Sequence, residues 1–232
     1  MARSQSRSET RIRIPVDGER STSGVLLMPG AGGQRTAVIV AHGAGNDMDT
    51  PLITSFAEGL CAAGYPAIRF NFLYKEEGRS APDRQEVLVR TWGSVFAHAG
   101  QLLAGKVDSW VAAGKSMGGR VASQMAAEGL LPVDGLIFLG YPLHPANDTG
   151  RLRDSHLYGI DTPMLFFAGT RDPLCGLPIL KRVLERLKAP WELLPIEGGD
   201  HSFHVPKALH RREDEVFFEI TGKAVEWLAR KE

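Results

Sequence analysis

One pattern recurs along this chain: a short apolar run, a loop that contains glycine, and then a longer amphipathic segment. Residues 36–41 (TAVIVA) are β-branched or apolar throughout, which is typical of a strand covered on both faces. Residues 50–63 follow with apolar side chains at helical spacing, and Gly64 stands where it can end that helix. Strands that alternate with helices predict the α/β class, a mostly parallel central sheet with helices on both faces.

The same pattern predicts the other elements. Residues 11–15 and 24–28 indicate an antiparallel pair of strands at the start of the sheet. Asp83 is expected to cap the helix that begins at residue 84. Further strands are predicted at 65–72, 110–113, 135–140, 164–168 and 191–196, and further helices at 84–103, 117–128, 177–187 and 220–230.

No repeat or low-complexity linker divides the 232 residues, a length that suits one α/β domain. We expect a single domain over residues 11–232, preceded by a disordered polar tail at residues 1–10. No window approaches 18 uninterrupted apolar residues, so no membrane span is expected. Lys plus Arg equals Asp plus Glu at 27 each, and this balance gives no indication of nucleic-acid binding.

The two cysteines, Cys61 and Cys175, lie far apart in the sequence. One disulfide is compatible with this count, but isolated thiols suit the reducing cytoplasm better, and we expect a cytoplasmic protein. No CxxC or HxxxH spacing indicates a zinc site. We therefore expect no metal and no cofactor, and either a monomer or a homodimer.

The run Gly114-Lys115-Ser116-Met117-Gly118 has the pattern of a nucleophile elbow. In such an elbow the serine sits on a sharp strand-to-helix turn, and small residues are needed two before and two after it. Ser116 follows a predicted strand and precedes a predicted helix, whose free N–H groups would favour negative charge nearby. The motif alone is weak in a chain with 26 glycines, so its position supports the prediction that Ser116 is the nucleophile.

A serine nucleophile needs a histidine as base and a carboxylate to orient that histidine, in the chain order Ser, Asp or Glu, His. His201 follows the last predicted strand, and Asp172 follows the strand before it, so we expect these two to act with Ser116. The other candidates are weaker because of their positions: His204 as an exposed loop residue, Asp161 at the wrong end of its strand, Asp200 as a direct neighbour of His201, and His144 and His156 too early in the chain.

An acyl-transfer site also needs N–H donors for the oxygen that becomes negative. The backbone N–H of Met117, next to the serine, is one expected donor. The loop after residues 36–41 should supply the other, from Ala44 or alternatively Gly45, because its small residues allow close approach. We expect His42 to brace this loop rather than to take part in the chemistry.

Four motifs, HGAG, GKSMGG, GTRDP and GGDHSF, resemble the α/β-hydrolase superfamily in order and spacing across nearly the whole chain. Residues 42–50 (HGAGNDMDT), 70–84 (FNFLYKEEGRSAPDR) and 140–145 (GYPLHP) resemble a small lidless bacterial branch related to dienelactone hydrolases. That branch is also similar to a subunit of a eukaryotic histone-acetylating complex. The resemblance implies the α/β-hydrolase fold without a lid domain and a serine-hydrolase triad at Ser116, Asp172 and His201.

One departure bears on the substrate. Dienelactone hydrolases have a cysteine at the elbow, whereas this chain has Ser116. The difference favours a small ester, thioester or related acyl substrate over a lactone. The segment 141–160, roughly twenty residues, is too short for a folded cap and predicts a shallow, open pocket. Side chains near its mouth could bind a carboxylate-bearing substrate or could equally be solvated; they are Arg79, His144, Arg151, Arg153 and His156.

The sequence therefore predicts a serine hydrolase that acts on a small acyl substrate. Two alternatives remain open. The fold could belong to a catalytically silent interaction protein, since fold alone does not establish activity. A cofactor-free haloperoxidase or an acyl transferase would use the same triad.

Overall fold

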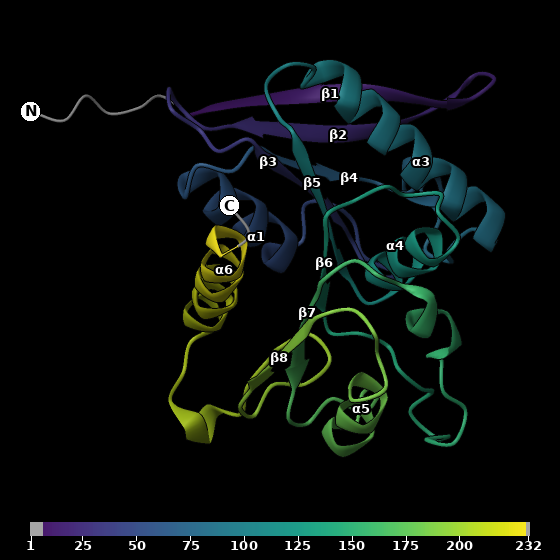
Figure 1. Ribbon diagram of the computed structural model, residues 1–232, viewed down its shortest axis with the longest axis vertical. Helices are drawn as coiled ribbons and strands as arrows, with labels where there is room; N and C mark the ends of the chain where they lie inside the picture. The colour runs from purple at the N-terminus through teal and green to yellow at the C-terminus, as the bar shows by residue number, and fades with distance from the viewer. Residues whose placement is uncertain (1–6, 231–232) are drawn as a thin grey trace, which may run out of the picture.

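The computed structural model describes residues 7–230. Its strands are β1 (Ser8–Asp17), β2 (Arg20–Met28), β3 (Thr36–Ala41), β4 (Ala67–Phe70), β5 (Ser109–Lys115), β6 (Gly135–Leu139), β7 (Met164–Gly169) and β8 (Trp191–Ile196). They form one sheet in the order β1-β2-β4-β3-β5-β6-β7-β8 (Figure 1). The β1–β2 and β2–β4 pairs are antiparallel, and all other neighbours are parallel. The predicted mostly parallel sheet is thus confirmed.

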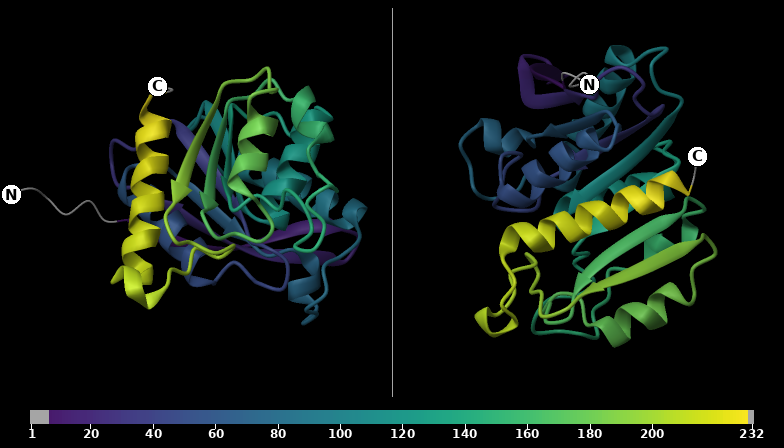
Figure 2. Two further views of the ribbon diagram at one scale, coloured as in Figure 1. Left: turned by 90° about the horizontal axis from the view of Figure 1, so that it is seen from below. Right: turned by 90° about the vertical axis from the view of Figure 1, so that its left-hand side faces the viewer.

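Helices cover both faces of this sheet. The α-helices are α1 (Pro51–Ala62), α2 (Leu73–Glu76), α3 (Gln85–Leu102), α4 (Met117–Ala127), α5 (Leu177–Leu184) and α6 (Glu213–Ala229), and two short 3₁₀ helices are η1 (Ser155–Gly159) and η2 (Lys207–Leu209). Helices α1 and α6 pack on one face, while α3, α4 and α5 pack on the other (Figure 2).

The alternation within β3 shows why this arrangement forms. Ala37, Ile39 and Ala41 pack into the core on the α3–α4–α5 face, and Val38 and Val40 pack into the core on the α1–α6 face. Successive side chains of a strand point to opposite faces, so an all-apolar strand needs cover on both sides. The carboxyl ends of the parallel strands then meet at one edge of the sheet.

Two predicted boundaries were wrong. β1 begins at Ser8, so residues 8–10 belong to a strand paired with β2 rather than to a disordered tail; the expected tail at residues 1–6 lies outside the described residues. Helix α6 begins at Glu213, seven residues before the predicted start at 220. Apolar spacing did not reveal the first turn of α6, because the residues of that turn are polar. A capping box marks the start of the helix: the Glu215 side chain accepts the N–H of Arg212 at 3.1 Å.

The segment after β4 also differs from the prediction. The strand ends at Phe70 instead of residue 72, and the unpredicted helix α2 follows. Asp83 does not cap α3, whose N-cap residue is Arg84. Its carboxylate instead accepts the N–H of Tyr74 in the first turn of α2, at 3.0 Å. A short helix next to a strand has little periodicity of its own, so sequence spacing could not reveal it.

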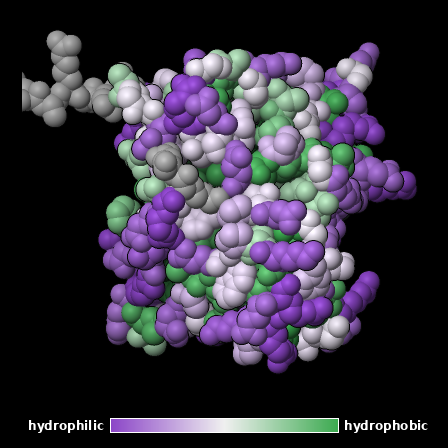
Figure 3. Space-filling view, in the orientation of Figure 1, coloured by the Kyte–Doolittle hydropathy of each residue, from purple (hydrophilic) through white to green (hydrophobic). Residues whose placement is uncertain are grey.

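No folded cap covers the sheet edge between β6 and β7; the connecting segment contains only η1. The face seen in Figure 3 mixes polar and apolar side chains, with polar ones over most of it. Within residues 7–230, no helix is long and apolar enough to cross a membrane.

Candidate active site

Ser116 sits at the turn from β5 into α4 in a strained backbone conformation. Its φ is +49° and its ψ is −113°, in a region that non-glycine residues rarely adopt. Its N–H donates to the Leu139 carbonyl at 3.3 Å, which ties the turn to the neighbouring strand β6. This is the conformation expected of a nucleophile elbow, with the side chain held at the end of the strand.

Close backbone approaches explain the glycines on either side of the serine. A Cβ atom on Gly114 would lie 2.3 Å from the Gly119 nitrogen, and one on Gly118 would lie 2.5 Å from the His42 carbonyl oxygen. Strand, turn and helix therefore fit together only without side chains at these positions.

A continuous line of hydrogen bonds joins the three residues that the sequence singled out. The Ser116 Oγ lies 2.8 Å from His201 Nε2, and His201 Nδ1 lies 2.7 Å from Asp172 Oδ2. Because an ionised carboxylate only accepts, Nδ1 carries the proton of a neutral His201 ring and Nε2 is left to accept from the Ser116 hydroxyl.

The loops that carry Asp172 and His201 are held together by their backbones. A Cβ on Gly169, at the end of β7, would lie 2.2 Å from the Gly199 carbonyl oxygen, so only glycine allows this contact. The side chain of Asp172 is completely buried, and its second oxygen accepts the Leu174 N–H at 2.8 Å. The carboxylate is thereby fixed in the orientation that faces His201.

Asp200, the alternative carboxylate, is used differently. Its Oδ1 accepts the backbone N–H groups of Ser202 at 2.7 Å and His204 at 3.0 Å, which closes the turn around His201. His204 is exposed, as predicted. Asp200 thus shapes the loop and makes no hydrogen bond to the His201 ring among the described residues.

The two expected backbone donors lie at the start of α4 and in the turn at Gly43. Met117 is the first residue of α4, where N–H groups have no acceptor within the helix. Ala44 lies in a turn closed by the Asn46 N–H, which donates to the Gly43 carbonyl at 3.3 Å. Gly45, the alternate donor, is the next residue in the same turn and has a φ of +76°. Ala44 stays the expected donor.

Two buried side chains hold this turn. His42 Nδ1 donates to the Gly43 carbonyl at 2.8 Å, and Nε2 accepts the Phe72 N–H at 3.1 Å. Burial lowers the pKa of His42 to about 4, so the ring is neutral at pH 7, in keeping with the expected bracing role. The Tyr74 hydroxyl donates to the same Gly43 carbonyl at 3.3 Å, and burial raises its pKa to about 12.

The other polar residues near the mouth are engaged within the protein. His144 Nδ1 donates to the Pro145 carbonyl, and its Nε2 accepts the Gly176 N–H at 3.1 Å, so the ring clamps the loop after Asp172. His156 Nε2 lies 2.9 Å from Ser123 Oγ. Arg79 pairs with Glu77 and Asp83. Arg151 is exposed, and Arg153 donates to the Pro142 carbonyl.

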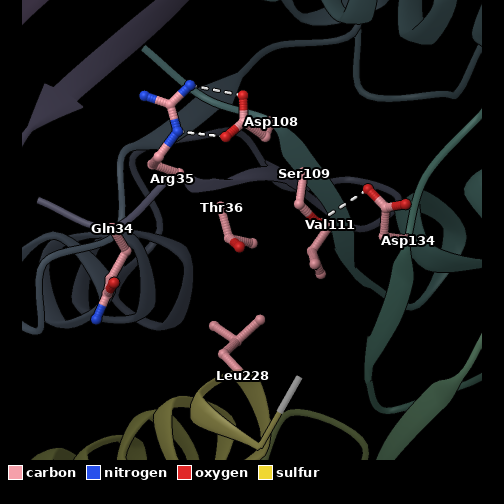
Figure 4. Close-up of a pocket in the computed structure, with 8 residues that line it drawn as sticks. All are labelled: Gln34, Arg35, Thr36, Asp108, Ser109, Val111, Asp134 and Leu228. Carbon is pink, nitrogen blue, oxygen red and sulfur yellow. Dashed lines mark hydrogen bonds and ion pairs between the residues drawn. The ribbon is translucent and has the colours of Figure 1, made fainter. Parts of the chain in front are cut away.

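A cavity of about 680 Å³ lies elsewhere. Figure 4 shows its lining, which includes Thr36 and Ser109 at the amino ends of β3 and β5. Parallel sheets bind ligands at the carboxyl ends of their strands. The cavity is thus at the opposite edge of the sheet from Ser116.

Sequence reasoning missed two residues that adjoin the site. Tyr74 lies in the unpredicted helix α2, and no spacing rule linked it to the turn at Gly43. Lys115, next to Ser116, is buried with 5% of its surface exposed, and burial lowers the pKa of its ammonium to about 8. Strand alternation could have placed Lys115 on the α1–α6 face, but not shown what surrounds it there.

Comparisons with solved structures show the same fold. A dienelactone hydrolase from Anabaena variabilis is 23% identical, with a TM-score of 0.74 over 97% of this chain and 98% of that one. An α/β serine hydrolase without a lid, from Xanthomonas campestris, is 20% identical, with a TM-score of 0.73 over 94% of each chain. An α/β serine hydrolase homologue from Coxiella burnetii is 19% identical, with a TM-score of 0.73 over 95% of this chain and 97% of that one.

A family described as the alpha/beta hydrolase domain matches residues 34–229, which include the elbow, both loops and the turn at Gly43. The match covers most of the chain, and the described architecture agrees with it from β3 to α6. On this basis the chain belongs to the alpha/beta hydrolase family.

Proposed function

We propose that this protein is a serine hydrolase that cleaves a small ester, thioester or related acyl substrate through an acyl-enzyme. The observation that carries the proposal is the unbroken hydrogen-bonded line from Ser116 through His201 to the buried carboxylate of Asp172. A base in contact with the nucleophile and an orienting group in contact with the base are the features that define such catalysis.

In the first step the Ser116 oxygen attacks the carbonyl carbon of the substrate, and its proton passes to His201 Nε2. The new C–O bond pushes the carbonyl electrons onto oxygen, which becomes negative. Asp172 keeps Nδ1 protonated and stabilises the imidazolium, because its buried carboxylate faces that nitrogen at 2.7 Å. When the tetrahedral intermediate collapses, the bond to the leaving group breaks and the imidazolium protonates that group.

The negative oxygen would be held by the N–H groups of Met117 and Ala44. The first turn of α4 adds its dipole to the Met117 donor. Water then repeats the sequence on the acyl-enzyme: His201 takes a proton from the water, whose oxygen attacks the acyl carbon, and Ser116 leaves with the proton returned. The triad and the two backbone donors carry every step of this sequence.

The segment 141–160 contains only η1 and no folded cap, which supports a shallow site open to solvent. The similarity to a dienelactone hydrolase is a similarity of fold. The serine at the elbow, Ser116, supports an oxygen nucleophile that attacks esters or thioesters.

The two carboxylates near His201 provide the test of this mechanism. With para-nitrophenyl acetate as substrate, Asp172→Asn should lower kcat by about 10³–10⁴-fold, since it removes the group that fixes the histidine tautomer. Asp200→Asn is the matched control, and it should retain most of the activity because the Asp200 carboxylate contacts backbone N–H groups of its own turn and the His204 ring, 3.5 Å away, and not the His201 ring. A larger loss in Asp200→Asn than in Asp172→Asn would overturn the assignment.

Alternative activities would show themselves in the same assays. An acyl transferase would consume the ester faster when an acceptor alcohol or amine is added, and a haloperoxidase would need peroxide and halide. A catalytically silent interaction protein would leave para-nitrophenyl acetate to hydrolyse at the rate of the buffer alone, and that result would reject the proposed function.

A further inference from the structure

A second cavity, about 170 Å³, lies beside the candidate active site on the α1–α6 face of the sheet. Its lining includes a neighbour of each part of that site: Lys115 precedes Ser116, Asn46 follows the turn at Gly43, and Ser202 follows His201. At ~30 Å³ for each water, this volume holds about five water molecules, enough for a small ligand.

Lys115 forms a buried wall of this cavity. Val111 and Ala113, four and two residues earlier on β5, pack into the core on the α1–α6 face, so strand alternation directs Lys115 to that face as well. Its ammonium makes no hydrogen bond or ion pair with any residue from 7 to 230. The residue is 95% removed from water, and an ammonium in such a setting without a protein partner is unfavourable unless an anion or water completes its environment.

The start of α1 also lines this cavity. Leu52 and Ile53 lie in the first helical turn, where N–H groups have no acceptor within the helix, and Thr50 makes no side-chain cap. Neither N–H has a partner in the described part of the chain. The helix dipole adds to the positive potential at this end.

Polar side chains complete the donor set. The Asn46 amide and the Ser202 hydroxyl line the cavity and make no hydrogen bond to another described residue. One carboxylate, Glu213, also lines it, but the His204 ring lies 3.7 Å from that carboxylate. Asp172 and Asp200 act on Lys115 only through space and favour its charged form.

We propose that this cavity binds a small oxyanion, a phosphate or a carboxylate, between the Lys115 ammonium and the first turn of α1. Residues that carry donors without a protein partner line it from β5, α1 and the His201 loop, and an oxyanion is a ligand that accepts from such donors. The ligand could be a free anion or the acidic end of an acyl substrate, because the cavity adjoins Ser116 along the chain. Binding of a free anion does not depend on the proposed hydrolysis.

Calorimetric titration with inorganic phosphate at pH 7 and constant ionic strength tests the site directly. The wild type should give a saturable isotherm, and Lys115→Met should weaken the affinity by at least about tenfold, since a charge-assisted hydrogen bond is lost. Lys106→Met, which removes an exposed lysine elsewhere, should bind phosphate like the wild type. No saturable binding to the wild type, or equal binding to wild type and Lys115→Met, would overturn the proposal.

A second variant, Ser202→Ala, tests the site even if Lys115→Met does not fold. Ser202→Ala removes only a half-buried hydroxyl and should weaken phosphate binding less than Lys115→Met, by about two- to tenfold. If Lys115→Met does not fold, unchanged phosphate affinity in Ser202→Ala and Asn46→Ala together would count as the contradicting result.

Kinetics then separate the two sources of the anion, with two para-nitrophenyl esters as substrates: the acidic succinate monoester and the neutral acetate. If the cavity receives the acidic end of a substrate, phosphate should raise KM for the succinate monoester and leave KM for the acetate unchanged. If the ligand is a free anion, phosphate should bind the protein by calorimetry without raising KM for the succinate monoester. Both kinetic results support the anion site. The site is rejected by the calorimetric outcomes given above: no saturable phosphate binding, or binding that the substitutions leave unchanged.

Discussion

The turn at Gly43 shows how single buried groups determine the geometry of the site. Two donors, His42 Nδ1 and the Tyr74 hydroxyl, converge on one carbonyl oxygen, that of Gly43. This bracing supports the proposed role of the Ala44 N–H in the same turn, because preorganised stabilisation of a negative oxygen requires donors that are held in place.

Tyr74→Phe tests this bracing. The substitution removes one hydroxyl from a buried ring, so the fold should persist while kcat falls by roughly 2–10-fold with little change in KM, the equivalent of one neutral hydrogen bond. Steady-state kinetics with para-nitrophenyl acetate measure the change. Tyr158→Phe is the control, because that hydroxyl bonds Asp154 on a different segment, at 2.5 Å. Equal kcat values for Tyr74→Phe and the wild type would contradict the bracing role.

Lys115 should make stability depend on pH in a defined direction. Its pKa is about 8 in the folded protein, chiefly because of burial, against about 10.4 in an unfolded chain. Between these values the unfolded state holds a proton that the folded state has released, so this group makes stability rise with pH. In buffer without oxyanions, Lys115→Met should be more stable than the wild type at pH 7, by an amount on the order of a few kcal/mol.

That advantage of Lys115→Met should shrink as the pH rises from 8 to about 10.4, as the wild type sheds the buried charge. Urea unfolding of both proteins across this range gives the difference in free energy of unfolding. A difference that stays constant with pH would show that the pKa of Lys115 is not lowered by folding.

Positions along the sequence singled out Ser116, Asp172 and His201, because each stands at or shortly after the end of a recognisable strand, and the structure joins these three by hydrogen bonds. Tyr74 and Lys115 could not be selected in this way. The partners of a buried polar group come from side chains of several distant segments. Local spacing in the sequence therefore does not reveal these partners.

At the scale of elements, the elbow depends on contacts between backbones. β5, the turn at Ser116 and α4 approach so closely that Gly114 and Gly118 face backbone atoms of Gly119 and His42. The need for small residues at the two flanking positions was predicted from the motif, and the distances give its physical reason.

Gly118→Ala should therefore destabilise the fold by roughly 1–3 kcal/mol or more, since the new Cβ meets the His42 carbonyl oxygen, which cannot move freely. Gly222→Ala in α6 is the opposite case: the added Cβ meets open space in a helix, and stability should rise by up to about 1 kcal/mol. Urea unfolding measures both. A Gly118→Ala protein as stable as the wild type would contradict the packing described for the elbow.

Element boundaries were less predictable than element types. β3 and β8 were predicted at their observed positions. In β3, burial on both faces leaves a clear apolar pattern. The start of α6 was missed because a capping box, not an apolar residue, sets it. Helix α2 was missed because a helix of 4 residues is defined by its tertiary contacts.

At the scale of the whole molecule, the sheet separates two cores. Cys61 belongs to the core on the α1–α6 face and Cys175 to the core on the α3–α4–α5 face, and both are free and buried. Burial raises the pKa of both thiols, that of Cys175 to about 12. The central sheet thus lies between the two thiols.

Thiol titration should reflect this separation. In the native protein, both cysteines should react slowly with Ellman's reagent, because they are buried and protonated. In guanidinium chloride without reductant, two thiols per chain should react at once. Fewer than two thiols after denaturation would show a disulfide and contradict the described arrangement.

The overall architecture was the most predictable feature, since alternating strands and helices admit few connections. The ligand is the least predictable, because it depends on loops whose side chains are arranged by the complete fold. The central claim, that Ser116 is an activated nucleophile, is open to a direct chemical test.

That test is intact-mass analysis after treatment with a fluorophosphonate. The wild type should gain the mass of one adduct, and Ser116→Ala should gain none. Ser123→Ala is the matched control: Ser123 Oγ also lies 2.9 Å from a histidine nitrogen, that of His156, but outside an elbow, so this variant should be labelled like the wild type. Labelling of Ser116→Ala to the same extent as the wild type, or no labelling of the wild type while a control esterase reacts, would contradict the account.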